Sequence, residues 1–90
     1  MSQITDNAAS SRFEMPVEGH IAFVTYRRGP GTIALLHAEV PAELEGRGVG
    51  SRLAKAALEV VRAEGLKVIP RCSFIAAYIQ RHPEYQDLLD

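Results

Sequence analysis

Apolar runs separated by glycine and proline predict four strands along this chain. Residues 12–17 and 20–28 are joined by a short turn, and residues 20–28 alternate between two faces. One of these faces consists of Ala22, Val24 and Tyr26, and the other of Ile21, Phe23 and Thr25. Residues 32–40 follow a Gly-Pro-Gly turn and begin apolar on both faces, which is typical of a central strand. The short connections arrange these segments as an antiparallel meander, and residues 66–69 form a further short, buried strand.

Two later segments carry helical spacing. Residues 48–64 place an apolar stripe on one side of a helix, and Gly65 fits its C-terminal cap. Residues 73–81 predict a second helix, which Ser73 caps and the His82-Pro83 step ends. The expected order is therefore β-β-β-α-β-α, an α+β fold with a mainly antiparallel sheet and two main helices.

Composition narrows the class of protein. The 90 residues suffice for one small domain, and 10 Lys and Arg against 11 Asp and Glu leave no basic surface to recruit nucleic acid. The single cysteine, Cys72, excludes an internal disulfide and fits a reducing compartment, so we expect a cytoplasmic protein. No apolar stretch approaches the roughly 20 residues that span a bilayer, so we expect no membrane partner. Residues 1–11 are polar and predict a disordered or frayed lead-in to a domain of residues 12–90.

The most informative motif is the glycine-rich turn Glu45-Gly46-Arg47-Gly48-Val49-Gly50-Ser51, between a strand pattern and a helix pattern. Alternate glycines allow a tight turn and close approach of the backbone to a ligand. The following helix directs its free N–H groups and the positive end of its dipole at the turn, which is how proteins bind phosphate. The surrounding pattern fits neither a Rossmann nor a Walker A motif. An ordinary glycine loop is the alternative.

This turn resembles the pyrophosphate-binding loop of the GNAT superfamily of acyl-CoA-dependent N-acyltransferases. The superfamily pattern is Gln or Arg, two residues, Gly, one residue, then Gly or Ala, after a strand and opening a helix. This chain has both final glycines, Gly48 and Gly50, but carries Glu45 at the Gln or Arg position. The segment from Cys72 to Tyr85 further resembles a short branch of the superfamily with a single cysteine. The likeness covers residues 20–89.

The resemblance implies a truncated GNAT-like fold in which the strands at residues 32–40 and 66–69 splay apart. The pantetheine arm of acetyl-CoA would enter between them, and the pyrophosphate would lie on the N–H groups of the glycine-rich turn. The acetyl-CoA-binding residues implied in this way are Val40, Arg47, Gly48, Val49, Gly50, Ser51 and Cys72.

Cys72 is the first candidate for catalysis, because it follows the strand that would border the thioester. A thiolate there can take the acetyl group covalently, and a thiol can protonate the departing CoA. The alternative is a small buried apolar residue, which is the common fate of a free cysteine. The superfamily usually has Asn at the position of Cys72 and a Tyr acid at that of Ile79, so its standard proton donor is absent.

His37 and Glu39 are the second candidates. Strand alternation places them on one face, about 7 Å apart, where Ile33 and Leu35 precede them. Either side chain can accept the proton of an amine, and the alternative is an exposed strand end.

His82 and Tyr85 fit a helix-ending step and a packing tyrosine better than a catalytic role. The histidines and the cysteine lie at no metal-ligand spacing, so we expect no metal.

The sequence thus predicts a minimal N-acetyltransferase that transfers an acetyl group from CoA to an unidentified amine. The superfamily builds its acceptor site from helices between the first two strands, where this chain has only Glu18-Gly19. An open acceptor site suits a protein or peptide amine. A non-catalytic CoA-binding module acting through a protein partner is the alternative, and a pure interaction domain is the third possibility. The oligomeric state is left open.

Overall fold

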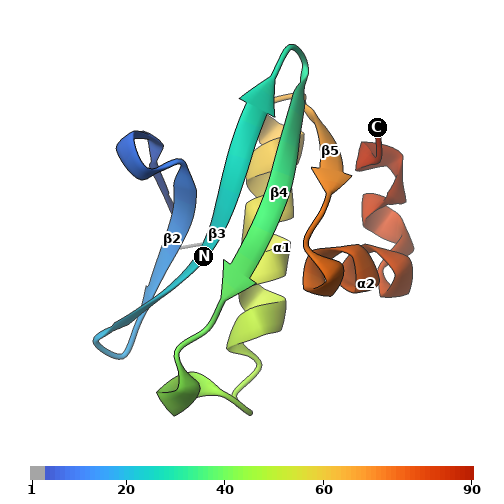
Figure 1. The fold of residues 1–90 in the computed structure, drawn as a ribbon. Helices are drawn as coiled ribbons and strands as arrows, with labels where there is room; N and C mark the ends of the chain where they lie inside the picture. Colours follow the sequence, from blue (N-terminus) through green and yellow to red (C-terminus); the bar gives the residue numbers. More distant parts are fainter. Residues whose placement is uncertain (1–3) are drawn as a thin grey trace.

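Five strands form one sheet in the order β1-β2-β3-β4-β5 (Figure 1). The computed structural model describes residues 4–90. Neighbouring strands are antiparallel, except that β4 and β5 are parallel and helix α1 connects them. The strands are β1 Thr5–Asn7, β2 Arg12–Val17, β3 His20–Gly29, β4 Thr32–Glu39 and β5 Lys67–Pro70. The predicted α+β fold with a mainly antiparallel sheet is confirmed.

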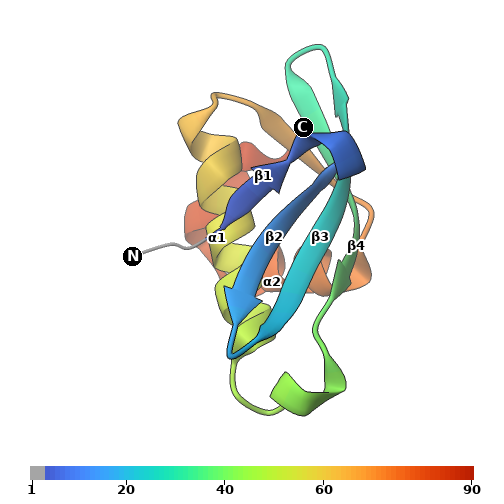
Figure 2. The same cartoon turned by 90° about the vertical axis from the view of Figure 1, so that its left-hand side faces the viewer.

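Both predicted main helices are present. Helix α1, Val49–Ala63, covers one face of the sheet, and helix α2, Ser73–Arg81, follows β5 at the edge of the sheet (Figures 1 and 2). The 3-10 helix η3, Pro83–Leu88, returns beside α1. The sequence predicts Ser73 as the N-terminal cap of α2, and this prediction is wrong. Cys72 holds the cap position in an extended conformation, and its side chain makes no capping hydrogen bond.

Gly65 caps the C-terminal end of α1, as the sequence predicts. Gly65 adopts a left-handed conformation with φ +70°. Its N–H donates to the carbonyl oxygen of Arg62 at 3.0 Å, and the N–H of Leu66 donates to that of Val61 at 3.1 Å. This pair of bonds is a Schellman motif, which satisfies carbonyl groups that the helix end leaves without partners.

The hydrophobic core lies between α1 and the sheet. Ala22, Val24 and Tyr26 of β3 are buried, so of the two faces predicted from alternation this is the one that α1 covers. The buried side chains of α1 are Val49, Leu53, Ala54, Ala56, Ala57, Leu58 and Val61. No helix of residues 4–90 covers the opposite face of β2 and β3 (Figure 2), where Ile21 is exposed.

The N-terminal segment differs from the expected frayed lead-in. Within residues 1–11, strand β1 pairs with β2, and a 3-10 turn, η1 Ala8–Ser10, follows it. The Tyr26 hydroxyl donates to Asp6 of β1, and Arg28 donates to the same carboxylate at 2.9 Å. The sequence Thr-Asp-Asn has no apolar alternation from which a strand could have been predicted. Polar contacts, and not apolar packing, attach this strand to the sheet. Residues 1–3 lie outside the described residues.

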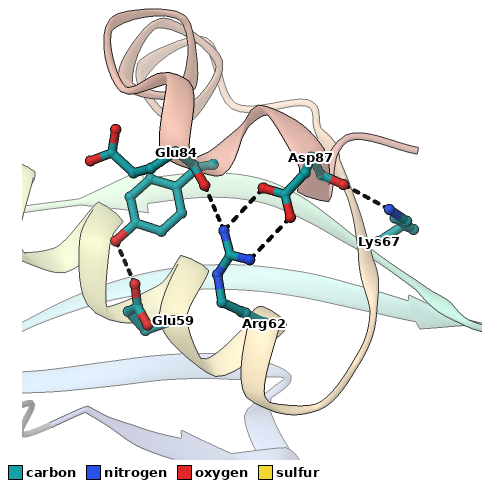
Figure 3. A network of polar contacts seen from close by, with 6 residues as sticks. Glu59, Arg62, Lys67, Glu84 and Asp87 are labelled. Atoms are coloured by element: carbon teal, nitrogen blue, oxygen red, sulfur yellow. Dashed lines mark hydrogen bonds and ion pairs between the residues drawn. The ribbon is translucent and has the colours of Figure 1, made fainter.

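Polar contacts attach the C-terminal segment to α1 (Figure 3). Arg62 donates to both carboxylate oxygens of Asp87, at 3.0 Å each, and to the carbonyl oxygen of Glu84 at 2.6 Å. The Tyr85 hydroxyl donates to the Glu59 carboxylate at 2.6 Å. The hydrogen bonds from Arg62 hold the pKa of Asp87 below its ordinary value of 3.8.

We predict that Asp87 makes stability depend on pH. Because its pKa is lowered in the folded state, its contribution is present above the ordinary value of 3.8 and is lost as the pH falls through the lowered pKa. Asp87→Asn should therefore destabilise the protein near neutral pH but progressively less in acid. Urea denaturation at a series of pH values measures this difference. In an Arg62→Gln background, most of this difference in stability should disappear. A difference between wild type and Asp87→Asn that stays constant with pH would contradict the assignment.

Candidate functional site

A pocket of about 290 Å³ lies where the end of β4, the glycine-rich turn and the first turns of α1 and α2 meet. Its lining residues are Val40, Leu44, Glu45, Gly46, Gly48, Val49, Gly50, Ser51 and Phe74. The structure thus brings together most of the residues predicted to bind acetyl-CoA. Two of the predicted residues, Arg47 and Cys72, are not part of this lining.

The glycine-rich turn presents backbone amides to the pocket. Gly46 and Gly48 have left-handed conformations, with φ +82° and φ +72°. Gly48 is the N-cap of α1, and its carbonyl oxygen accepts the first helical bond, from Arg52 at 3.1 Å. The N–H groups of the first turn therefore have no partner within the helix. A Cβ atom on Gly48 would have nothing within 4 Å, so the space above this glycine is open to a ligand. Free amides at a helix N-terminus fit an anion such as a diphosphate.

The position of Gly50 differs from that of Gly48 in what surrounds it. A Cβ atom at Gly50 would lie 3.0 Å from Cζ of Phe74. The missing side chain therefore makes room for an aromatic wall contributed by α2, and Phe74 is 39% exposed there. Sequence reasoning missed Phe74, because only the tertiary structure brings the first turn of α2 against that of α1.

The two charged residues of the glycine-rich turn differ in their surroundings. Glu45 lines the pocket. Nη1 of Arg47 instead lies 2.5 Å from Oε1 of Glu18, in the turn between β2 and β3. The guanidinium group of the glycine-rich turn is thus already paired with a carboxylate.

A β-bulge in β4 decides where His37 and Glu39 lie. Thr25 pairs with His37 and the next residue, Tyr26, pairs with Leu35, so Leu36 is an extra residue in β4. A bulge inserts one residue and reverses which face the following side chains occupy. The prediction that His37 and Glu39 share the face of Leu35 is therefore wrong, because Leu35 faces α1 and they lie on the opposite face.

His37 and Glu39 nevertheless form a pair. Nε2 of His37 lies 3.1 Å from Oε1 of Glu39, and the two side chains are 61% and 59% exposed. An imidazole held by a carboxylate is an arrangement that can accept a proton from a substrate. The pair is open to solvent on the face of the sheet that α1 does not cover.

Cys72 lies at the point where β4 and β5 part. The two strands are paired only as far as Leu35 and Pro70. The N–H groups of Arg71 and Cys72 then both donate to the carbonyl oxygen of Leu35, at 3.0 Å each. Beyond this point β4 continues to Glu39 while β5 has ended, which agrees with the implied gap between these strands. The Cys72 side chain is 8% exposed and belongs to the hydrophobic core, so it does not join the exposed pair.

The remaining candidates have structural contacts. The ring of His82 stacks on Tyr78 at a centroid distance of 3.8 Å, and its Nδ1 lies 2.8 Å from the Tyr78 carbonyl oxygen. Tyr85 is buried and bonded to Glu59, and burial is the main cause that raises its pKa. Ile79, at the position of the superfamily's usual Tyr acid, is fully buried.

Residues 4–90 were predicted to hold no metal and to cross no membrane, and two structural features bear on these expectations. No three His, Cys, Asp or Glu side chains are grouped so as to hold a metal ion. No helix in this part of the chain has the length and apolar character needed to cross a membrane.

Comparison with known proteins gives the family. Residues 12–88 match the family model described as GCN5-related N-acetyl-transferase, so the chain belongs to this family. The NMR solution structure of a GCN5-like protein from Staphylococcus aureus, described as a candidate N-acetyltransferase, matches with a TM-score of 0.72 and 32% identity. The match covers 100% of this chain and 91% of that one. The predicted GNAT-like fold and family are confirmed.

Vertebrate relatives are also similar. Protein NATD1 of Xenopus tropicalis is 42% identical over 55 residues, which cover 61% of this chain and 50% of the relative. Protein NATD1 of Danio rerio is 39% identical over 59 residues, covering 63% of this chain and 54% of the relative. The chain thus spans about half the length of the curated relatives it matches.

We predict that the two glycines respond differently to alanine. Gly48→Ala forces a Cβ atom into a left-handed conformation and should lower the free energy of unfolding by about 1–2 kcal/mol. Gly50→Ala should change it by less than about 1 kcal/mol, because the far end of the Phe74 ring can move and alanine favours the helix. Urea denaturation of both variants checks this. Equal losses would show that neither conformation nor Phe74 explains these positions.

Proposed function

We propose that this protein binds acetyl-CoA at the N-terminus of α1 and transfers the acetyl group to an amine. The observation that carries the proposal is the pocket above Gly48, where free amides of α1 meet open space beside the end of β4. The diphosphate of CoA would lie on these amides, and its pantetheine arm would follow the unpaired edge of β4 toward Cys72. Family membership supports acyl transfer as the reaction class.

The reaction needs a nucleophilic amine and a proton for the leaving group. The amine nitrogen attacks the carbonyl carbon of the thioester, the carbon–sulfur bond breaks, and the amine loses a proton. CoA leaves as a thiolate, which takes up a proton. In the covalent variant, the Cys72 thiolate first displaces CoA, and the amine then cleaves the new thioester on Cys72.

The pair of His37 and Glu39 is the proposed base. Their contact of 3.1 Å lets one side chain orient the other, and their exposure leaves the pair accessible to an amine. Cys72 is the proposed group at the thioester, because its backbone marks the point where β4 and β5 part. This point is within two residues of His37 along β4.

The acceptor is proposed to be an amine of a protein or peptide. Strands β2 and β3 are joined only by Glu18 and Gly19, so no helix stands between them to enclose a small acceptor. The open face beside His37 and Glu39 suits a side chain or a chain terminus presented by a larger molecule. We keep the cytoplasm as the proposed location, where acetyl-CoA and reduced thiols occur together.

A non-catalytic CoA-binding module is the second candidate, and one observation favours it. Cys72 is buried in the core, whereas His37 and Glu39 are exposed on the opposite face, so the three side chains are not assembled around one point. Such a module would bind CoA and act through a protein partner without turnover.

Calorimetric titration with CoA and acetyl-CoA, followed by intact mass measurement, tests the central proposal. We expect both ligands to bind and acetyl-CoA to add one acetyl group to the protein but not to Cys72→Ala. Binding without an adduct, and without acetylation of any offered amine, would favour the non-catalytic module. Absence of binding would remove the assignment of the pocket.

We further predict that substitutions in the proposed base lower the rate of acetyl transfer without weakening the binding of CoA. Glu39→Gln and His37→Asn should each lower the rate of amine acetylation by about 100-fold or more, with the affinity for CoA unchanged. Thr25→Ser is the matched control, because Thr25 pairs with His37 across the sheet, carries no titratable group, and serine keeps the hydroxyl that donates to the His37 carbonyl oxygen at 3.4 Å. A normal rate in both test variants would show that the pair is only an exposed strand end.

A further inference from the structure

The turn between β2 and β3 has an unusual residue at an exposed position. Val17 pairs with His20, so Glu18 and Gly19 alone form the turn. Both have positive φ, +50° for Glu18 and +81° for Gly19, as in a type I′ turn. Asn, Asp and Gly are favoured at the first of these positions, and any other side chain is sterically disfavoured there. Local conformation therefore does not account for a glutamate in this turn.

The side chain of Glu18 reaches the glycine-rich turn, 29 residues further along the chain. Its Oε1 accepts a hydrogen bond from Nη1 of Arg47 at 2.5 Å. Arg47 stands between the two left-handed glycines, Gly46 and Gly48. The side chains of Arg47 and Glu18 are 53% and 61% exposed, and ion pairs this exposed contribute little to folding stability. Stability does not account for the contact either.

We propose that Glu18 is a positioning residue that controls how strongly the pocket binds an anionic ligand. This inference rests on the proposed function, in which a diphosphate approaches the amides that follow Arg47. The diphosphate and the Glu18 carboxylate compete for one guanidinium group. Arg47 can contact the ligand only after its guanidinium group leaves Glu18. The free energy of breaking this contact weakens the binding of phosphate.

The other charges near the pocket make this competition effective. Glu45 lines the pocket and adds a second negative charge close to the ligand. Arg47 carries a positive charge that could offset Glu45 at the ligand, but it is already bound to the carboxylate of Glu18. The contact is exposed, so the expected effect is modest, about three- to five-fold in affinity, as for exposed ion pairs in general.

The test is titration of the whole chain with CoA and with pantetheine, which lacks the phosphates. Glu18→Gln removes the charge and keeps the shape of the side chain. It should bind CoA about three- to five-fold more tightly, with no change for pantetheine. In an Arg47→Gln background the same substitution should give no gain. Glu18→Asn should give the same gain in CoA affinity together with a higher melting temperature, because asparagine suits the left-handed conformation.

Glu43→Gln is the matched control, since Glu43 is an exposed residue of η2, Ala42–Leu44, that does not line the pocket. It should leave both affinities unchanged. Wild-type binding of CoA without a gain in Glu18→Gln would overturn this inference and leave the proposed function standing. An equal gain in the Arg47→Gln background would also overturn it, because Glu18 would then act through its charge alone. If neither wild type nor any variant binds CoA, the proposed function fails and this inference falls with it.

Discussion

The carbonyl oxygen of Leu35 accepts hydrogen bonds from two successive amides, those of Arg71 and Cys72, and the candidate site depends on this junction. It ends the parallel pairing of β4 and β5 while β4 still has residues to run. Helix α1 connects these two parallel strands, so its N-terminus lies at the same end of the sheet as the gap. The unpaired edge of β4 and the free amides of α1 are therefore neighbours as a consequence of topology.

The two ends of α1 are held in different ways. Its C-terminal end is tied by the Schellman motif at Gly65, by Arg62 to Asp87, and by Arg28 to Glu64 at 2.8 Å. Its N-terminal end begins at a left-handed glycine, borders an open pocket and approaches the β2–β3 turn through the exposed contact of Arg47 with Glu18. Such exposed contacts open at little cost in free energy, and binding sites are drawn from regions of this kind.

The same arrangement explains why the candidate catalytic side chains lie on two faces of the sheet. The bulge at Leu36 moves His37 and Glu39 away from the face that α1 covers, while Cys72 enters the core beside the junction. A ligand lying in the gap between β4 and β5 would have access to both faces. The two proposed functions, a transferase and a CoA-binding module, use the same pocket and differ in whether an amine is acetylated.

The sequence by itself determined those features that depend on local chemistry. Helix α1 lies within one residue of its predicted limits and α2 matches them, because apolar spacing, glycine at the C-terminal end and the His-Pro step act over a few residues. The alternation of β3 between two faces was predictable for the same reason. Only the tertiary structure decided the rest. Strand β1 is held by Tyr26 and Arg28, Phe74 meets Gly50 across two helices, and Glu18 meets Arg47 across 29 residues. The bulge at Leu36 arises from pairing with β3, and no pattern within β4 marks it. Contacts between distant segments and the register of paired strands are set by the partner, which a local pattern does not contain.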